Sequence, residues 1–166
     1  MPHLIILRGN SGSGKTSVAK ALQKRLGSNT MLVSHDMIRM QILHVWGKEG
    51  IEKSLPLMQE LVRYGACHSQ FTILEGILGS GEYADLFETC REVFGSCIHA
   101  YYYDLPFEET LRRHKTKPNC NEFGEAEMRR WWRGKDLLTM IPETILTADA
   151  GFEETVERIL SAVHAD

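Results

Sequence analysis

The sequence predicts a single α/β domain, residues 1–166, built on a parallel sheet with helices on both faces. Short apolar runs typical of buried strands alternate along the chain with segments whose apolar residues recur at helical spacing. A glycine-rich loop, residues 9–16, joins the first of these runs to the first helical segment. The 166 residues are the length of one domain, and 43% of them are hydrophobic, which allows a sizeable core.

The expected strands are apolar runs that lie between polar or glycine-containing segments. The first run is His-Leu-Ile-Ile-Leu, and the fourth is rich in residues that favour strands. The five predicted strands cover residues 3–7, 31–33, 71–74, 97–103 and 144–147. Ligands of parallel sheets bind beyond the carboxyl ends of the strands, so the residues that follow these runs are candidates for chemistry.

The first helix is predicted directly after the glycine-rich loop. Val18, Leu22 and Leu26 recur there at helical spacing, and Gly27 is a natural stop. Similar spacing predicts further helices over residues 37–45, 51–66, 80–94, 107–114, 125–138 and 152–163.

Three details of these elements follow from single residue types. Pro56 is expected near the first turn of its helix, where a missing N–H group is tolerated. Asp104 is expected to be the N-cap of the helix that carries Phe107 and His114. Residues 115–124 are polar and contain Pro, Asn and Gly, so they are predicted to form a loop.

The glycine-rich loop matches the phosphate-binding motif G-x-x-x-x-G-K-[ST]. Its residues are Gly9, Asn10, Ser11, Gly12, Ser13, Gly14, Lys15 and Thr16. The motif lies between a predicted strand and a predicted helix, which is the context that it requires. The glycines let the backbone turn tightly and bring several N–H groups to one polyphosphate, and the helix start adds its positive dipole end.

The motif also assigns roles to the polar side chains at the start of the helix. Lys15 is expected to reach the β- and γ-phosphates of ATP, and the hydroxyl of Thr16 is expected to bind Mg²⁺. Ser17, the next residue, completes the expected nucleotide-binding set. ATP and Mg²⁺ are therefore the predicted cofactors.

The second strand is followed by Asp36, with Arg39 one helical turn further on. Residues three apart share a helix face. The Asp36 carboxylate could accept the proton of an acceptor hydroxyl or orient that hydroxyl, while the Arg39 guanidinium could hold an anionic group of the acceptor. The structural alternative is an Asp that stabilises the positive end of its helix beside a solvated Arg. His35 is expected to be a neighbour of this site and not a catalyst.

Glu75 follows the third predicted strand, just before Gly76. An acid at the tip of a buried strand resembles a Walker B position, where it could hold Mg²⁺ through water or bind acceptor hydroxyls. The alternative is an acid that only caps a loop. ATP-hydrolysing motors commonly carry two acids here, and this chain has one.

Two basic clusters flank the predicted loop at residues 115–124. Arg113 and Lys117 lead into it, and Arg129 and Arg133 follow it. Together they favour a lid, about residues 112–133, that closes over ATP, excludes water and brings positive charge to the transferring phosphoryl group. The alternative is a solvated helix face, since several Glu residues lie nearby.

Charge and composition narrow the expected partners. The net charge of −3 gives no reason to expect non-specific nucleic-acid binding or adhesion to an anionic membrane. No apolar run approaches the roughly 18–20 residues that a membrane-spanning helix needs, and a basic leader is lacking. The cysteines, which form no C-x-x-C pair, are expected to be reduced thiols and mostly packing residues: Cys67, Cys90, Cys97 and Cys120. The chain is predicted to be soluble and cytoplasmic.

These motifs together resemble the small P-loop kinases. The residues that carry the resemblance are the loop 9–16, Asp36 with Arg39, Glu75, and the run 103–114, Tyr-Asp-Leu-Pro-Phe-Glu-Glu-Thr-Leu-Arg-Arg-His. The group includes the polynucleotide-kinase-like, chloramphenicol-phosphotransferase-like, zeta-toxin-like and nucleotide-kinase-like enzymes. The resemblance implies a three-layer P-loop NTPase fold with a five-stranded parallel sheet in the order 2-3-1-4-5.

The same resemblance implies site residues. The general-base Asp of these kinases corresponds to Asp36, and the acceptor-side Arg of the polynucleotide-kinase branch corresponds to Arg39. Its lid arginines correspond to Arg113 and to Lys117, where lysine cannot make the two-pronged contact of arginine. The transition-state role could therefore pass to Arg113 or to an arginine after the loop, Arg129 or Arg133.

The predicted function is transfer of the γ-phosphoryl group of ATP to a hydroxyl or phosphate of an unidentified acceptor. Lys15, Asp36, Arg39 and Arg113 are the predicted catalytic residues, and Asp36, Arg39 and Glu75 the predicted acceptor site. A GTPase switch is not favoured, because the chain lacks an N/T-K-x-D guanine motif. A non-catalytic or switch-type ATP-binding regulator stays open as the alternative.

Overall fold

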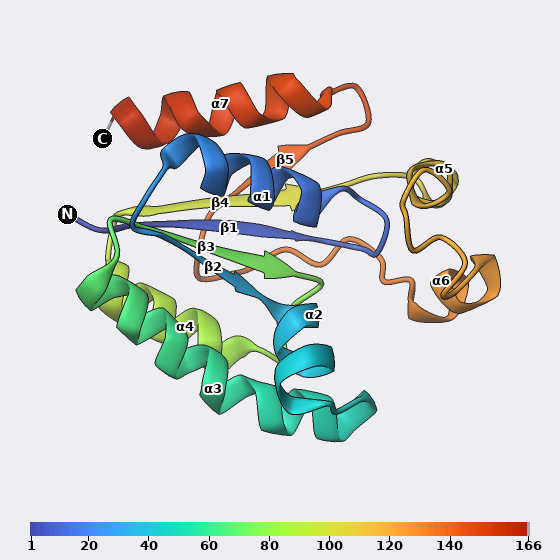
Figure 1. The fold of residues 1–166 in the computed structure, drawn as a ribbon, viewed down its shortest axis with the longest axis horizontal. Helices are drawn as coiled ribbons and strands as arrows, with labels where there is room; N and C mark the ends of the chain where they lie inside the picture. The colour runs from blue at the N-terminus through green and yellow to red at the C-terminus, as the bar shows by residue number, and fades with distance from the viewer. Residues whose placement is uncertain (166) are drawn as a thin grey trace.

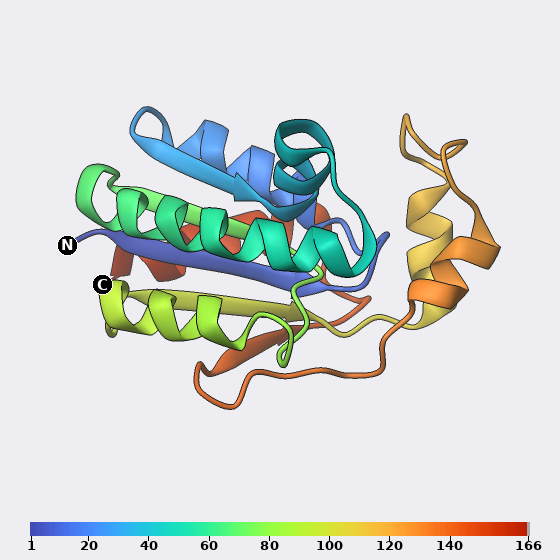
Figure 2. The ribbon, with the colours of Figure 1, turned by 90° about the horizontal axis from the view of Figure 1, so that it is seen from below.

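A computed structural model describes residues 1–165, and the five strands within them form one parallel sheet. Their order across the sheet is β2-β3-β1-β4-β5 (Figure 2), so the predicted order is confirmed. The strands are β1 (His3–Gly9), β2 (Thr30–Ser34), β3 (Phe71–Gly76), β4 (Ile98–Tyr103) and β5 (Glu143–Leu146).

Helices cover both faces of the sheet and make a three-layer domain (Figure 1). On one face lie α1 (Lys15–Leu26) and α7 (Phe152–Ala165), and on the other α3 (Gly47–His68) and α4 (Ala84–Phe94). The central strand β1 serves both cores, since Leu4 and Ile6 pack with the α3–α4 side and Ile5 and Leu7 with the α1–α7 side. Burial on both faces explains why this strand reads as continuously apolar.

The remaining helices lie at the carboxyl ends of the strands (Figure 1). Helix α2 (His35–Met37) follows β2 and widens into a π-type turn, η1 (Ile38–Leu43), in place of the single helix predicted over 37–45. Helices α5 (Phe107–His114) and α6 (Glu125–Trp131) stand apart from the sheet, with residues 115–124 between them. The sequence pattern placed this pair correctly at the edge where ligands bind in such folds.

The predicted helix over residues 125–138 is wrong after residue 131. The chain leaves α6 at Trp131 and runs extended across the end of the sheet toward β5. The backbone N–H of Arg133 is bonded to the side chain of Asn10, and that of Asp136 to the hydroxyl of Tyr102. These contacts replace the bonds that a continued helix would make.

Two end assignments are also wrong. Pro106, not Asp104, is the N-cap of α5. The polar groups of Asp104 have other partners, because its N–H donates to the backbone oxygen of Leu146 at the end of β5 and its carboxylate pairs with Lys135 at 2.9 Å. Pro56 lies inside α3 and not near its first turn, because that helix already begins at Gly47. The segment 47–50 lacks the apolar spacing that would have revealed the earlier start.

Cys67 is exposed, Cys120 is partly exposed, and Cys90 and Cys97 are buried, all as free thiols. Burial raises the pKa of the Cys90 thiol to about 12. Within residues 1–165, no helix is both long enough and apolar enough to cross a membrane.

Candidate active site

The phosphate-binding loop connects β1 to α1 and contacts α5 and α6, the two helices that stand apart from the sheet. Gly12 and Gly14 have φ angles of 80° and 98°, which disfavour other residues. A Cβ atom at residue 12 would also lie 2.5 Å from the backbone oxygen of Thr110 in α5 and 3.0 Å from the side chain of Met128 in α6. The glycine is therefore required both for the turn and for the close approach of these helices.

Lys15 lies folded within the loop. Its Nζ donates to the backbone oxygen of Asn10 at 2.8 Å and to Ser13 Oγ at 3.1 Å, and the residue is only 7% exposed. Burial lowers the pKa of Lys15 to about 8, against the opposing effect of the nearby carboxylates of Glu75 and Asp36. The charges of both predicted acids therefore act on this lysine.

Glu75 is buried between the loop helix and β2. Thr16 Oγ1 donates to the carboxylate, 3.3 Å from each of its oxygens, and Ser34 Oγ donates to Oε1 at 2.5 Å. Parallel pairing of β3 with both β1 and β2 brings the three strand ends to one edge, which explains how residues 16, 34 and 75 meet. Ser34 was not among the predicted site residues, although its position at the end of β2 was a usable signal.

Asp36 and Arg39 lie on one side of α2 and η1, as their spacing predicted. Arg39 Nη2 is 3.9 Å from Asp36 Oδ1, a loose ion pair, and the Asp36 side chain is 63% exposed. The stem of Arg39 packs against Gly50, and its Nε is buried without a hydrogen-bond partner among the described residues. Asp36 is therefore open to a ligand, while Arg39 is held mainly by packing.

A cavity of about 390 Å³ lies beside the loop. Its lining combines the loop and the start of α1 with α5 and the β5–α7 connection: Gly14, Ser17, Arg113, Lys117, Asp149 and Ala150 are among the lining residues. Tyr103 also lines the cavity, and its buried hydroxyl has no hydrogen-bond partner within residues 1–165. The position next to the phosphate-binding loop suits the nucleoside part of a nucleotide.

Two of the four predicted lid cations face the loop. Arg113 Nη1 donates to the backbone oxygen of Ser13 at 2.8 Å, and its Nε donates to Glu109 at 2.7 Å. Lys117 is partly buried, which lowers its pKa, while the charges of Glu75 and Asp36 act in the opposite direction. Lys117 therefore lies within electrostatic reach of both predicted acids.

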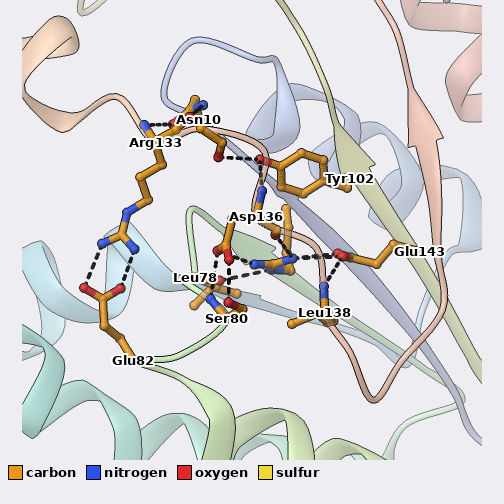
Figure 3. Close-up of polar contacts among 11 residues, drawn as sticks. Asn10, Leu78, Ser80, Glu82, Tyr102, Arg133, Asp136, Leu138 and Glu143 are labelled. Carbon is orange, nitrogen blue, oxygen red and sulfur yellow. Dashed lines mark hydrogen bonds and ion pairs between the residues drawn. The ribbon is translucent and has the colours of Figure 1, made fainter.

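The other two lid cations are held by different groups. Arg129 donates twice to Glu125, at 2.8 and 3.0 Å, and its guanidinium lies 4.2 Å from the centre of the Phe107 ring. The side chain of Arg133 pairs with Glu82 at 2.6 and 2.8 Å (Figure 3). The structure thus does not bring the four cations to a single point.

The backbone of Arg133 is nevertheless fixed to the phosphate-binding loop. Asn10 Nδ2 donates to the backbone oxygen of Arg133 at 2.8 Å, and the Arg133 N–H donates to Asn10 Oδ1 at 3.0 Å (Figure 3). Asn10 was expected only as one residue of the nucleotide cradle. Its side chain joins that cradle to the segment that leaves α6.

A buried cluster of charged side chains holds the segment that follows Arg133. The sequence analysis did not predict this cluster. Arg8, which is fully buried, pairs with Glu143 at 2.8 Å and with Asp136 at 3.0 Å, and donates to the backbone oxygen of Leu78. Asp136 also accepts from the N–H and hydroxyl of Ser80 (Figure 3). An arginine inside an apolar strand was the available signal, because a buried charge requires partners.

The parallel order 2-3-1-4-5, the glycine loop at the end of β1 and the helices at the carboxyl edge define the fold of the small P-loop kinases. The resemblance to this group, its zeta-toxin-like members included, is confirmed by two comparisons. Residues 1–62 match the model of the Zeta toxin family, a stretch that holds the phosphate-binding loop, Asp36 and Arg39.

Solved structures extend the likeness to nearly the whole chain. A gluconokinase from Sinorhizobium meliloti matches with a TM-score of 0.67 and 16% identity over 99% of this chain and 93% of that one. The APS kinase of Mycobacterium tuberculosis, solved with AMPPNP and APS, matches with a TM-score of 0.66 and 18% identity over 98% of each chain. Shikimate kinase from Acinetobacter baumannii matches with a TM-score of 0.60 and 18% identity over 99% of this chain and 94% of that one.

These identities establish a shared fold. No significant match to a curated protein sequence was found.

Proposed function

We propose that this protein is an ATP-dependent kinase that transfers the γ-phosphoryl group to a hydroxyl, or to a phosphate, of a small acceptor. The observation that carries the proposal is that Thr16, the residue after Lys15, donates to the buried carboxylate of Glu75. The charges of Glu75 and Asp36 also act on Lys15, where they oppose the lowering of its pKa by burial. These observations support a donor site with a candidate base near it, as phosphoryl transfer needs.

On the donor side, the backbone N–H groups of the loop and Lys15 bind the phosphates, and the nucleoside occupies the cavity of about 390 Å³. The residues present fit a magnesium ion, because Thr16 and Glu75 offer hydroxyl and carboxylate oxygens within 3.3 Å of each other. Thr16 would hold the ion directly and Glu75 through water. When bound, the ion neutralises charge that builds up on the phosphates.

On the acceptor side, Asp36 orients the hydroxyl and accepts its proton, while Arg39 and Glu75 shape the site. Arg113 and Lys117 bring positive charge to the transferring group, and Arg129 and Arg133 belong to the same lid. Lid closure excludes water, which would otherwise hydrolyse ATP.

The test is ATP consumption across a panel of acceptors, namely nucleosides, 5′-hydroxyl oligonucleotides, sugars and phenicol- or aminoglycoside-type antibiotics. We expect one chemical class to raise ADP formation well above the rate without acceptor, and mass spectrometry of that acceptor to show one added phosphoryl group. The variant Lys15→Met should lose this stimulation.

The regulator hypothesis makes the opposite prediction. If ATP binds tightly and no acceptor class increases its consumption, the protein is an ATP-binding regulator and the kinase proposal fails. ADP formation without phosphorylated acceptor would equally contradict it, because the lid is proposed to exclude water.

A further inference from the structure

The ring of His35 is held from one side by a buried hydroxyl. His35 is 5% exposed, and its Nε2 lies 2.5 Å from the hydroxyl oxygen of Tyr83, which is itself 2% exposed. The two rings meet edge to face, with centroids 5.0 Å apart. The Tyr83 oxygen also lies 3.2 Å from Ser54 Oγ, in α3. A chain of three polar groups therefore runs from α3 to the start of α2.

The other ring nitrogen is the one nearer to the candidate base. His35 Nδ1 is buried and has no hydrogen-bond partner among the described residues, and it lies 3.9 Å from Asp36 Oδ1. Arg39 Nη2 is 3.9 Å from the same oxygen. The side chain of His35 packs directly on Gly76, where a Cβ atom would lie 2.6 Å from that of His35. Packing and the Tyr83 contact together limit the directions in which the ring can turn.

The ring is neutral at physiological pH. Burial, followed by the charge of Arg39, lowers the pKa of His35 to about 4, while Asp36 and Glu82 act in the opposite direction. A neutral imidazole carries one proton. Burial also raises the pKa of Tyr83, so its hydroxyl keeps a proton that it can donate to Nε2. When Tyr83 donates to Nε2, the proton of His35 lies on Nδ1, the nitrogen 3.9 Å from Asp36 Oδ1.

We propose that His35 is a positioning residue for Asp36: when the acceptor binds, the 3.9 Å gap between Nδ1 and Asp36 Oδ1 closes, the Nδ1–H group donates to that oxygen, and the other carboxylate oxygen turns toward the acceptor hydroxyl. This inference rests on the proposed kinase function. In the reaction, the hydroxyl oxygen bonds to the γ-phosphorus of ATP as the bond from that phosphorus to the bridging oxygen of ADP breaks. ADP leaves, and the hydroxyl proton passes to Asp36. His35 keeps its own proton throughout.

Two substitutions separate this role from simple packing. In His35→Asn, the amide nitrogen can take the place of Nδ1, but nothing replaces Nε2. In His35→Gln, the amide can meet Tyr83 in place of Nε2, but the donor toward Asp36 is lost. We expect His35→Asn to retain kcat within about threefold of the parent and His35→Gln to lose about tenfold or more, with the KM for ATP similar in both.

The opposite order would overturn the inference, because it would mean that the contact with Tyr83 matters and the donor to Asp36 does not. Equal losses in both variants would also overturn it. Thermal unfolding and ATP binding of the two variants check that each is folded before the rates are compared.

The tautomer of His35 supplies a test that needs no acceptor. In ¹⁵N NMR spectra of the parent protein, we expect the protonated nitrogen of His35 to be Nδ1, and in Tyr83→Phe we expect a mixture of tautomers. A parent protein with its proton on Nε2 contradicts the inference. Because this measurement needs no catalysis, its failure is distinguishable from failure of the kinase proposal, which the acceptor panel tests.

Discussion

The side chain of Asn10 pairs with the backbone of Arg133 through both of its polar groups, at 2.8 and 3.0 Å. Asn10 belongs to the phosphate-binding loop, and Arg133 follows the last turn of α6. The side chain of Arg133 in turn pairs with Glu82 in the β3–α4 connection. One asparagine therefore links the loop to the segment that carries the lid back to the sheet, so movement of either must affect the other.

Asn10→Ala should loosen that link. We expect faster amide hydrogen exchange over residues 132–138 and a KM for ATP raised several-fold, because the loop and the exit from α6 no longer hold each other. The matched control is Ser11→Ala, at the neighbouring loop position. If exchange over 132–138 is the same in Asn10→Ala and Ser11→Ala, the two hydrogen bonds do not restrain this segment.

Asp36→Asn should abolish transfer to the acceptor while leaving ATP affinity nearly intact. The amide cannot accept the hydroxyl proton, and loss of a general base typically costs about 10²–10⁴-fold in rate. The measurement pairs the rate of acceptor phosphorylation with ATP binding by calorimetry. Asp85→Asn, on the exposed face of α4, is the control. A parent-like rate in Asp36→Asn would exclude the proposed mechanism.

Lys117→Met should reduce kcat more than Arg129→Met. Lys117 lies within electrostatic reach of Glu75 and Asp36, whereas Arg129 is paired with Glu125 and stacked on Phe107. Removing a charge that stabilises the transferring group is expected to cost about 10²–10³-fold in kcat. The comparison is made at saturating ATP and acceptor. An equal or larger loss in Arg129→Met would show that α6 turns its arginine inward when ligands bind.

Glu143→Ala should destabilise the fold strongly. The Glu143 side chain is 1% exposed and pairs with fully buried Arg8, and removing one partner of a buried pair costs about 3–5 kcal/mol. Urea unfolding gives the change in free energy of unfolding. The contrasting variant is Glu153→Ala, whose partner Arg25 lies on the surface, and it should change stability little. Similar effects of the two substitutions would mean that Arg8 finds other partners or water.

Local patterns predicted the framework of this protein from neighbouring residues. The glycine motif with its flanking strand and helix, the acids at the carboxyl ends of β2 and β3, and the basic residues around the 115–124 segment can all be read within short windows. The spacing of Asp36 and Arg39 also predicted that both side chains lie on one side of their helix. The distance of 3.9 Å between Arg39 Nη2 and Asp36 Oδ1 agrees with this prediction. Their roles in catalysis stay predictions that the variants above test.

The errors lie where distant residues decide the backbone. Residues 132–138 have a composition compatible with helix, yet they run extended because Asn10 and Tyr102 bind their N–H groups. Asp104 has the residue type of an N-cap, yet its N–H pairs with the edge strand β5 and its carboxylate with Lys135. Local propensity is a weak prior that tertiary contacts of this kind override.

The sequence by itself determined that a glycine-rich loop of the phosphate-binding type opens an α/β domain and that single acids stand at the ends of the strands beside it, because these features depend on residue type and near spacing. Only the tertiary structure decided which side chains meet across the chain. Arg8 and Glu143 are 135 positions apart, Asn10 and Arg133 are 123 apart, and His35 and Tyr83 are 48 apart. Such pairs form because packing of the helices against the sheet buries these polar side chains, and buried polar groups need hydrogen-bond partners within the protein.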